Sequence, residues 1–225
     1  MRKKMVITID GPAGAGKSTI SRIVAKKLGY IYLDTGSLYR ALAYKALRDA
    51  IVLDNPDALD RLCADTNITL KNIGGKMKVY VDGEDVGDQL RTEEVGLAAS
   101  KISTFPVVRQ RLLALQRKAG APGGIVAEGR DMGSVVFPSA DYKFFLDADI
   151  EERIKRRHRE LLNKGNSSEV PSIRKDMLAR DKQDSKREIA PLKPTSSSII
   201  IDSTKLSIPE VVEKIIRQVS KNNSW

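Results

Sequence analysis

The sequence predicts an α/β fold, in which a parallel sheet of about five strands is flanked by helices and carries a small antiparallel β insert. The first observation is that short apolar segments rich in β-branched residues alternate with segments whose apolar residues recur at helical spacing. The second is a glycine-rich loop between the first strand and the first helix. The third is that the segment 63–101 replaces this alternation with short strands and tight turns.

The stretch VITIDGPAGAGKST, residues 6–19, is the most informative part of the chain. Its first residues are typical of a buried strand, and residues 11–18 fit the phosphate-binding P-loop pattern of Gly, four residues, Gly-Lys-Ser. Glycines allow backbone N–H groups to surround phosphate oxygens, and the positive end of the following helix faces the same anion. We expect Lys17 to reach the β- and γ-phosphates and the Ser18 hydroxyl to bind Mg²⁺, partly through waters. This predicts a nucleotide-phosphate site on a P-loop NTPase fold; the alternative is a glycine-rich turn with a surface lysine.

The composition suits one domain, 1–225, because 41% of the 225 residues are apolar and can form a core. The net charge of +10 indicates acidic partners, either nucleic acid or polyphosphate ligands. The one cysteine, Cys63, excludes an internal disulfide, and with the one histidine, His158, it excludes cysteine and histidine metal sites. We expect Cys63 to be buried. No apolar run has the length of a membrane span, so we expect a cytoplasmic protein without a membrane partner.

The first half of the chain continues with alternating elements and then the insert. A second strand is expected over 30–33, and a helix from Ser37 onward. Thr35, between them, is a candidate helix N-cap near a phosphate. A short helix over 58–63 precedes the insert, which we place at 63–101. The insert is expected to contain three short strands, over residues 67–70, 76–81 and 84–86.

The second half begins with a long helix over 93–117 and then returns to alternation. Asp149 and Glu152 have the spacing of a capping box for the helix that follows the strand at 143–146. A break over 164–168 separates that helix from a basic one, and a closing helix opens at Ser207. The remaining elements are strands over 125–127 and 198–202, the basic helix over 173–190, and a frayed tail over 222–225.

Acidic residues follow four predicted strands, at the sheet edge where open α/β sheets bind ligands. They are Asp10, Asp34, Glu128 and Asp147. The helix beyond this edge carries Arg153, Arg156 and Arg157 at i, i+3 and i+4. We expect it to belong to a lid, 150–168, whose arginines stabilise charge on a transferred phosphoryl group above the P-loop. The alternative is a solvated basic face.

Two further groups combine cations with carboxylates. Arg130 and Asp131 follow a strand, and they unite a cation suited to phosphate with an acceptor suited to an exocyclic amine. The alternative is a purely structural Arg–Asp pair. A second group recurs at helical spacing, and its members could bind a ligand or only one another: Arg180, Asp184 and Arg187.

Five motifs occur together in this chain. They are DGPAGAGKS at 10–18, LDTG at 33–36 followed by Tyr39-Arg40, EGRDMG at 128–133, FLD at 145–147 and REIAPL at 187–192. In combination they resemble the bacterial cytidylate kinases over nearly the whole chain. The resemblance implies a CORE, an NMP-binding region extended by the insert, and a LID. It implies transfer of the γ-phosphoryl group of ATP to CMP or dCMP with Mg²⁺, giving ADP and CDP or dCDP. It also implies a monomer of pyrimidine metabolism with no nucleic-acid partner.

The resemblance also implies the site residues. ATP would be bound by nine consecutive residues, which are Gly11, Pro12, Ala13, Gly14, Ala15, Gly16, Lys17, Ser18 and Thr19. CMP would be bound by residues at three places: Thr35, Arg40 and Arg130 at the acceptor phosphate, Ser100, Arg109 and Asp131 at the cytosine, and Arg180, Asp184 and Arg187 at the sugar and phosphate. The catalytic cations would be Lys17 and the LID residues Arg153, Arg156 and Arg157. The chain departs from the usual Asp of the family at Glu128 and the usual Ser at Thr35, but both residues keep the needed oxygen.

Three other functions account for parts of the sequence. A switch-type NTPase would need a guanine-reading motif, and the chain contains no Asn-Lys-x-Asp. A kinase of a sugar or a shikimate-like acceptor would account for the P-loop, but it would need neither the insert nor Arg130 and Asp131. A nucleic-acid-binding protein would account only for the charge, because the chain has no recognised helix-turn-helix, zinc or aromatic stacking motif.

Overall fold

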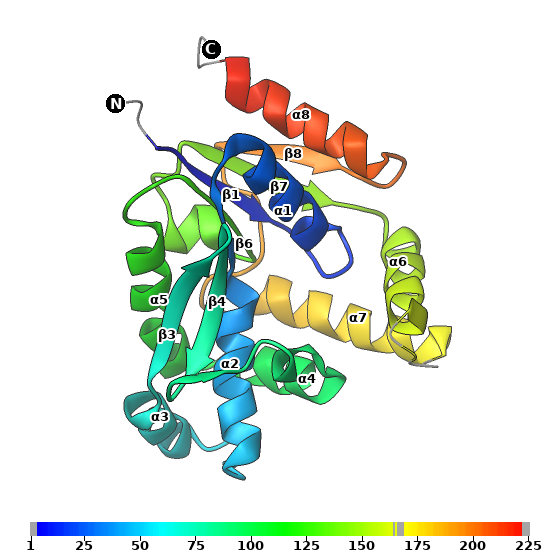
Figure 1. The fold of residues 1–225 in the computed structure, drawn as a ribbon. Coiled ribbons are helices and arrows are strands. Elements are labelled where there is room, and N and C mark those ends of the chain that lie inside the picture. The colour runs from blue at the N-terminus through cyan, green and yellow to red at the C-terminus, as the bar shows by residue number, and fades with distance from the viewer. Residues whose placement is uncertain (1–3, 164, 166–168, 222–225) are drawn as a thin grey trace.

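An eight-stranded sheet forms the centre of the computed structural model, which describes residues 4–163, 165 and 169–221 (Figure 1). The strand order is β3-β4-β2-β6-β1-β7-β8, and β5 pairs with β4. β1 pairs in parallel with β6 on one side and with β7 on the other, so the loop after β1 lies at the middle of the sheet edge. The strands are β1 (Val6–Asp10), β2 (Ile31–Asp34), β3 (Ile68–Ile73), β4 (Lys76–Val81), β5 (Glu84–Asp85), β6 (Ile125–Gly129), β7 (Tyr142–Asp147) and β8 (Ser198–Asp202).

The predicted parallel sheet and the predicted hairpin are both present, but they form one sheet. β2, β6, β1, β7 and β8 are the five parallel strands. β3 and β4 pair antiparallel, with Ile68 opposite Val81 and Ile73 opposite Lys76. Lys76 of β4 also pairs in parallel with Tyr32 of β2. The hairpin therefore extends the main sheet beyond β2.

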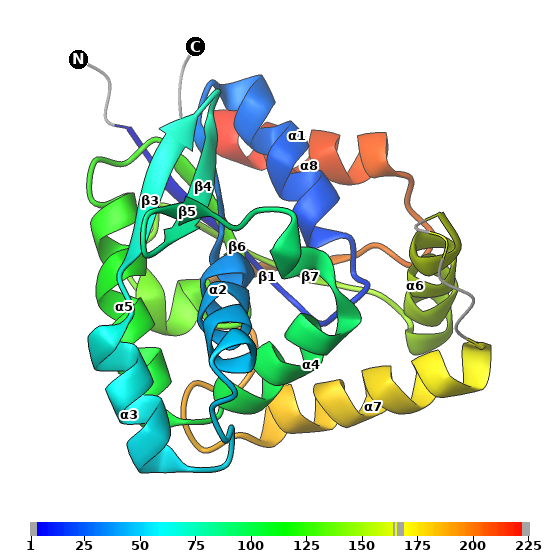
Figure 2. The same cartoon turned by 60° about the horizontal axis from the view of Figure 1, so that its bottom comes forward.

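Helices cover both sides of the sheet (Figure 2). On one side α1 (Lys17–Leu28) and α8 (Ile208–Lys221) share an apolar cluster with β1 and β7. On the other side Ile125 and Ala127 of β6 pack with η2 (Met132–Val136), a π-helical turn, and with α5 (Pro106–Gly120). A third cluster includes the buried Cys63 and gathers α2 (Thr35–Arg48), α3 (Pro56–Asp65), η1 (Gln89–Arg91), α4 (Glu93–Ile102) and α5 around the hairpin.

Helices α6 (Ile150–Asn163) and α7 (Val170–Lys186) stand apart from these layers. They extend away from the sheet edge in Figure 1. Their apolar side chains Ile154, Leu161, Ile173 and Met177 form a small cluster of their own. The pair is therefore held together by its own core, and Arg153 and Arg156 of α6 donate to the Ala13 and Ser203 carbonyls beside the sheet edge. None of the helices in the described part of the chain is long and apolar enough to span a membrane.

The predicted helix over 93–117 is wrong, because the structure has two helices there. α4 ends at Ile102 and α5 begins at Pro106. Proline has no N–H to donate and disfavours helical backbone at the residue before it. Phe105 accordingly has extended dihedral angles, φ −81° and ψ 128°. The chain turns at this point and separates the helix that carries Ser100 from the one that carries Arg109.

One predicted helix start and one predicted capping box also differ from the structure. α2 begins at Thr35, and its N-cap is Asp34, whose side chain accepts a hydrogen bond from the Ser37 N–H at 3.1 Å. Thr35 is therefore not an N-cap. The capping box of Asp149 and Glu152 does not form, because the Asp149 N–H donates to the Thr204 hydroxyl at 2.8 Å and Glu152 pairs with Arg156.

The basic helix α7 ends at Lys186, earlier than the expected residue 190. Arg187 is its C-cap and has extended backbone, and the Leu192 N–H then donates to the Asp184 carbonyl at 2.8 Å. This return of the chain keeps Arg187 beside Asp184. Apart from Gly165, the predicted break over 164–168 lies outside the described residues, and so does the predicted tail over 222–225.

Candidate active site

The loop between β1 and α1 has the geometry of a phosphate-binding loop. A Cβ added to Gly11 would lie 2.0 Å from the Leu146 carbonyl oxygen, so a side chain has no room there. Gly16 has φ 93°, a left-handed conformation suited to glycine, and directly precedes α1. No side-chain cap from the described residues occupies the N-terminus of α1. Its first N–H groups are thus available to an anion.

Lys17 is buried at the start of α1, and its Nζ donates to the Pro12 carbonyl at 2.7 Å. Burial, and next the positive charge of Arg130, lower the pKa of this ammonium to about 7, although Glu128 and Asp184 act in the opposite direction. The lysine is therefore a cation whose charge the protein alone only partly stabilises. An anionic phosphate at this loop would restore the missing stabilisation.

The four acidic residues end neighbouring parallel strands as expected, and two of them accept hydrogen bonds from backbone N–H groups. The Asp10 carboxylate accepts from the Met132 and Gly133 N–H groups, both at 2.8 Å, and so anchors η2. Burial raises the pKa of Asp10 to about 6 despite these bonds. The exposed Asp147 accepts from the Ala148 N–H at 2.8 Å. These two carboxylates organise the backbone of the edge.

Around β2 and β6 the residues expected at the acceptor phosphate are linked to strand ends. The buried Thr35 hydroxyl donates to the Glu128 carbonyl at 2.6 Å. Arg40, one turn along α2, pairs with Asp34 at 2.6 Å and remains partly exposed. Arg40 therefore keeps donor groups for a ligand, whereas the Thr35 hydroxyl proton is already used. The phosphate role of each stays a prediction.

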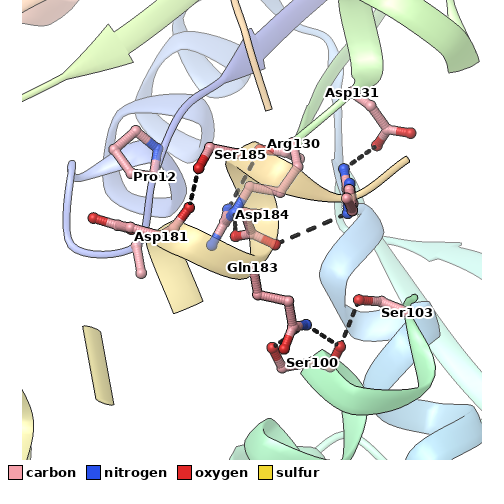
Figure 3. Close-up of polar contacts among 12 residues, drawn as sticks. Pro12, Ser100, Ser103, Arg130, Asp131, Asp181, Gln183, Asp184 and Ser185 are labelled. Carbon is pink, nitrogen blue, oxygen red and sulfur yellow. Dashed lines mark hydrogen bonds and ion pairs between the residues drawn. The ribbon is translucent and has the colours of Figure 1, made fainter. Parts of the chain in front are cut away.

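Arg130 and Asp131 are neighbours in sequence but do not pair with each other. Arg130 donates to Asp184 of α7 at 2.7 Å (Figure 3). Asp131 pairs with Arg109 of α5. Arg187 lies 4.0 Å from Asp131 and 3.9 Å from Asp184. Burial would raise the pKa of Asp184, but the surrounding arginines outweigh it and lower that pKa. The cluster joins the end of β6 to α5 and α7 through mutual ion pairs.

Arg180 adds a cation that is less well balanced. It is half-buried, and its buried Nε atom has no hydrogen-bond partner among the described residues. Burial, and next the charge of Arg130, lower its pKa to about 10, with smaller effects of the same sign from Arg157 and Arg40. A cluster of arginines that is not fully neutralised by carboxylates, and that keeps an unused N–H donor, is suited to bind an anion.

Ser100 is held by a residue that the sequence did not single out. Gln183 of α7 donates from Nε2 to the Ser100 carbonyl at 2.7 Å and to its hydroxyl at 3.1 Å (Figure 3). Because the hydroxyl oxygen accepts this bond, its proton is free to be donated elsewhere. No motif distinguishes Gln183; only its place between Arg180 and Asp184 on one helix could have suggested it.

The three arginines of α6 that the sequence assigns to the LID occupy different environments. The buried Arg153 donates to the Ala13 carbonyl at 3.1 Å and pairs with Asp181 at 2.7 Å. Arg156 donates to the Ser203 carbonyl at 2.7 Å and to its hydroxyl at 3.0 Å. Arg157 lines a cavity of about 130 Å³ together with Ala13 and Arg180. Only Arg157 thus faces the open space beside the P-loop, while the other two tie α6 to backbone around it.

The geometry defines an enzyme of the P-loop kinase class, with a phosphate loop at the centre of a parallel sheet and buried arginines opposite it. The family model described as cytidylate kinase matches residues 7–221. The chain belongs to the cytidylate kinase family.

Curated relatives agree with this membership over their full length. The chain is 47% identical to a cytidylate kinase of Geobacillus sp. (strain WCH70), over 98% of this chain and 99% of that protein. It is 45% identical to a cytidylate kinase of Pasteurella multocida (strain Pm70), over 99% and 98%. Among solved structures, a gluconokinase from Sinorhizobium meliloti 1021 shares the fold with a TM-score of 0.50 at 12% identity, over 98% of this chain and 94% of that chain. An uncharacterized protein from Eubacterium ventriosum ATCC 27560 shares it with a TM-score of 0.54 at 12% identity, over 97% of this chain and 100% of that chain.

Proposed function

We propose that the protein transfers the γ-phosphoryl group of ATP to CMP or dCMP, giving ADP and CDP or dCDP. One observation carries the proposal beyond the family name. Arg130, which belongs to the cluster around Asp131 and Asp184, is close enough to Lys17 to lower its pKa. The donor loop and the cations expected at the acceptor therefore lie near one another, as transfer between two bound phosphates requires.

On the donor side, residues 11–19 would hold the ATP phosphates, and Lys17 would stabilise charge on the transferred group. Mg²⁺ would supply further neutralisation of phosphate charge, and Ser18 would be its protein ligand. The donors present fit this ion. Glu128 has a buried oxygen without a hydrogen-bond partner among the described residues, and Ser18 is close enough to lower the pKa of that carboxyl. The described part of the chain has no cage of three or more acidic, His or Cys side chains, which suits an ion held mainly by substrate phosphates.

On the acceptor side, Arg40, Arg130, Arg180 and Arg187 would bind the CMP phosphate and sugar with Thr35 and Asp184. Asp131 would accept from the cytosine amine, and Arg109 and Ser100 would donate to the ring acceptors. The region 63–101 would extend the NMP-binding region, and 150–168 would be the LID. We further propose that the protein acts in the cytoplasm as a monomer without nucleic-acid partners, and that its positive charge serves its polyphosphate ligands.

A coupled ADP-release assay with a panel of acceptors tests this function. CMP and dCMP should be phosphorylated much faster than UMP, AMP and GMP. Shikimate and gluconate belong in the panel because the main alternative function is that of a P-loop kinase that phosphorylates a small metabolite. Faster turnover with either of them, or ATP hydrolysis independent of any acceptor, would contradict the proposal.

The LID arginines give a first prediction. Arg157→Ala should lower kcat by about 10²-fold with little change in the KM for CMP, because Arg157 lies beside the P-loop and would act on the transition state. Steady-state kinetics in both substrates measure this. Arg159→Ala, at an exposed position of the same helix, is the matched control. An effect confined to the KM for CMP would place Arg157 at the acceptor instead.

The low pKa of Lys17 gives a second prediction. Since the pKa is about 7, most of these ammonium groups are deprotonated at pH 8, and bound phosphates should raise the pKa again. ATP binding at pH 8 should therefore take up as much as about one proton, and at pH 6 almost none. Calorimetric titrations in buffers of different ionisation enthalpy measure the uptake. The same titration of Lys17→Met should show none, and buffer-independent heats for the wild type would contradict the assignment.

A further inference from the structure

Tyr32, which lies outside the five motifs, forms a buried pair with Glu128 of the EGRDMG motif. They lie on neighbouring parallel strands, with Tyr32 opposite Val126 and Asp34 opposite Glu128. Side chains two residues apart on a strand share one face, so the tyrosine ring and the carboxyl lie on the same side of the sheet. The Tyr32 hydroxyl donates to Glu128 Oε1, and both residues are buried, 5% and 3% exposed.

The other carboxyl oxygen is held differently. Glu128 Oε2 is buried and has no hydrogen-bond partner among the described residues. Glu128 lies opposite Ile9 of β1, whose last residue Asp10 directly precedes the P-loop. Burial and the charge of Asp34 raise the pKa of the Glu128 carboxyl, while Lys17 and Ser18 act in the opposite direction. A buried oxygen without a partner is unfavourable unless a ligand completes it. In this pair Tyr32 therefore holds Oε1, while Oε2 remains without a hydrogen-bond partner among the described residues.

We infer that Tyr32 is a positioning residue, which holds Glu128 so that Oε2 accepts from the water shell of a cation at Ser18. This inference rests on the proposed ATP-dependent function, since the cation would arrive with the nucleotide. Mg²⁺ demands nearly ideal octahedral geometry and keeps several waters, so an acceptor for those waters must be fixed in place. Glutamate has one more rotatable bond than aspartate, and the hydrogen bond from Tyr32 removes this freedom. Hydrogen bonds behind a metal-site carboxylate typically change metal affinity by 10–100-fold.

Tyr32→Phe tests the inference because it removes only the hydroxyl. The probe is Mn²⁺ titrated onto the enzyme in the presence of ADP and followed by electron paramagnetic resonance. Mn²⁺ affinity should fall by about tenfold, while the KM for CMP stays unchanged. Tyr30→Phe is the matched control: the Tyr30 hydroxyl accepts from the Met5 N–H at 3.4 Å, at the opposite end of β1 from the P-loop. Thermal unfolding of both variants shows whether the fold is retained.

A double-mutant cycle separates positioning from simple packing. Glu128→Asp shortens the side chain and should withdraw the carboxyl from the Tyr32 hydroxyl. Tyr32→Phe should then change Mn²⁺ affinity by much less than in the wild type, because the two effects are coupled. Equal effects in both backgrounds, or unchanged Mn²⁺ affinity in Tyr32→Phe, would overturn the inference. The measurement needs only ADP, so its failure is distinct from a failure of the wild type to phosphorylate CMP.

Discussion

Replacement of Lys17 by methionine is expected to lower kcat by about 10³-fold while the fold survives. Lys17 is the buried cation at the start of α1, and its Nζ is held over the loop by the Pro12 carbonyl. Loss of one positioned donor at a site of developing charge typically raises the barrier by about 3–4 kcal/mol. Methionine keeps most of the apolar side chain, so packing around α1 should be retained.

The stability of this variant should rise or stay constant near neutral pH. Burial depresses the pKa of Lys17 to about 7, so the folded protein binds the proton more weakly than the unfolded chain does. The charge therefore destabilises the fold below that pKa, and the destabilisation decreases as the pH rises from about 7 toward the unfolded value near 10.5. Thermal unfolding at pH 6 and pH 9 measures this. Lys26→Met, at an exposed position of the same helix, is the control, and near-normal turnover of Lys17→Met would contradict the catalytic role.

The second large effect concerns the choice of base. The wild type should prefer CMP over UMP by about 100-fold or more in kcat/KM. Cytosine presents an amine donor beside two acceptors, whereas uracil presents an acceptor at O4 and a donor at N3. UMP at this site would place O4 against the Asp131 carboxylate and its N3–H against Arg109. Each buried mismatch costs about 1–3 kcal/mol, and two of them account for the ratio.

Asp131→Asn should lower the ratio of kcat/KM for CMP over UMP, chiefly by loss of activity with CMP. The new amide can also turn its NH₂ toward O4 of uracil, which removes one of the mismatches with UMP. The substitution should also destabilise the protein, since it leaves Arg109 and Arg187 with less negative charge in a buried cluster. Kinetics with CMP and UMP and thermal unfolding separate the two effects. Asp54→Asn, which alters an exposed carboxylate paired with Lys101, is the control. An unchanged ratio in Asp131→Asn would mean that Asp131 does not read the base.

Local sequence patterns were sufficient for the parallel sheet and for the loop that contains Lys17. The glycines, the preceding strand and the following helix are encoded within a few consecutive residues, so their geometry follows from local rules. The break at Pro106 was equally local, and the apolar periodicity that continues across it led to the wrong single helix.

The partners within the site could not be predicted in this way. Arg130 pairs with a residue 54 positions away and Asp131 with one 22 positions away, while Tyr32 and Glu128 are 96 apart. Such partners are selected by the packing of α5, α7 and β2 around the end of β6, and no spacing along the chain encodes that packing. The alternative interpretation of Arg130 and Asp131 as a structural pair with each other is wrong, because each pairs with a distant residue instead.

α7 has a consequence for how the two substrates affect each other. Its first half packs with α6 through Ile173 and Met177. Its second half carries Arg180 and Asp184, which we propose bind the acceptor, and Gln183, which holds Ser100. Its 17 residues form one uninterrupted rod of about 26 Å. If ATP binding displaces α6, the rigid helix α7 would therefore transmit that displacement to the residues proposed to bind the acceptor. Linkage requires that each substrate then alter the affinity for the other by the same factor.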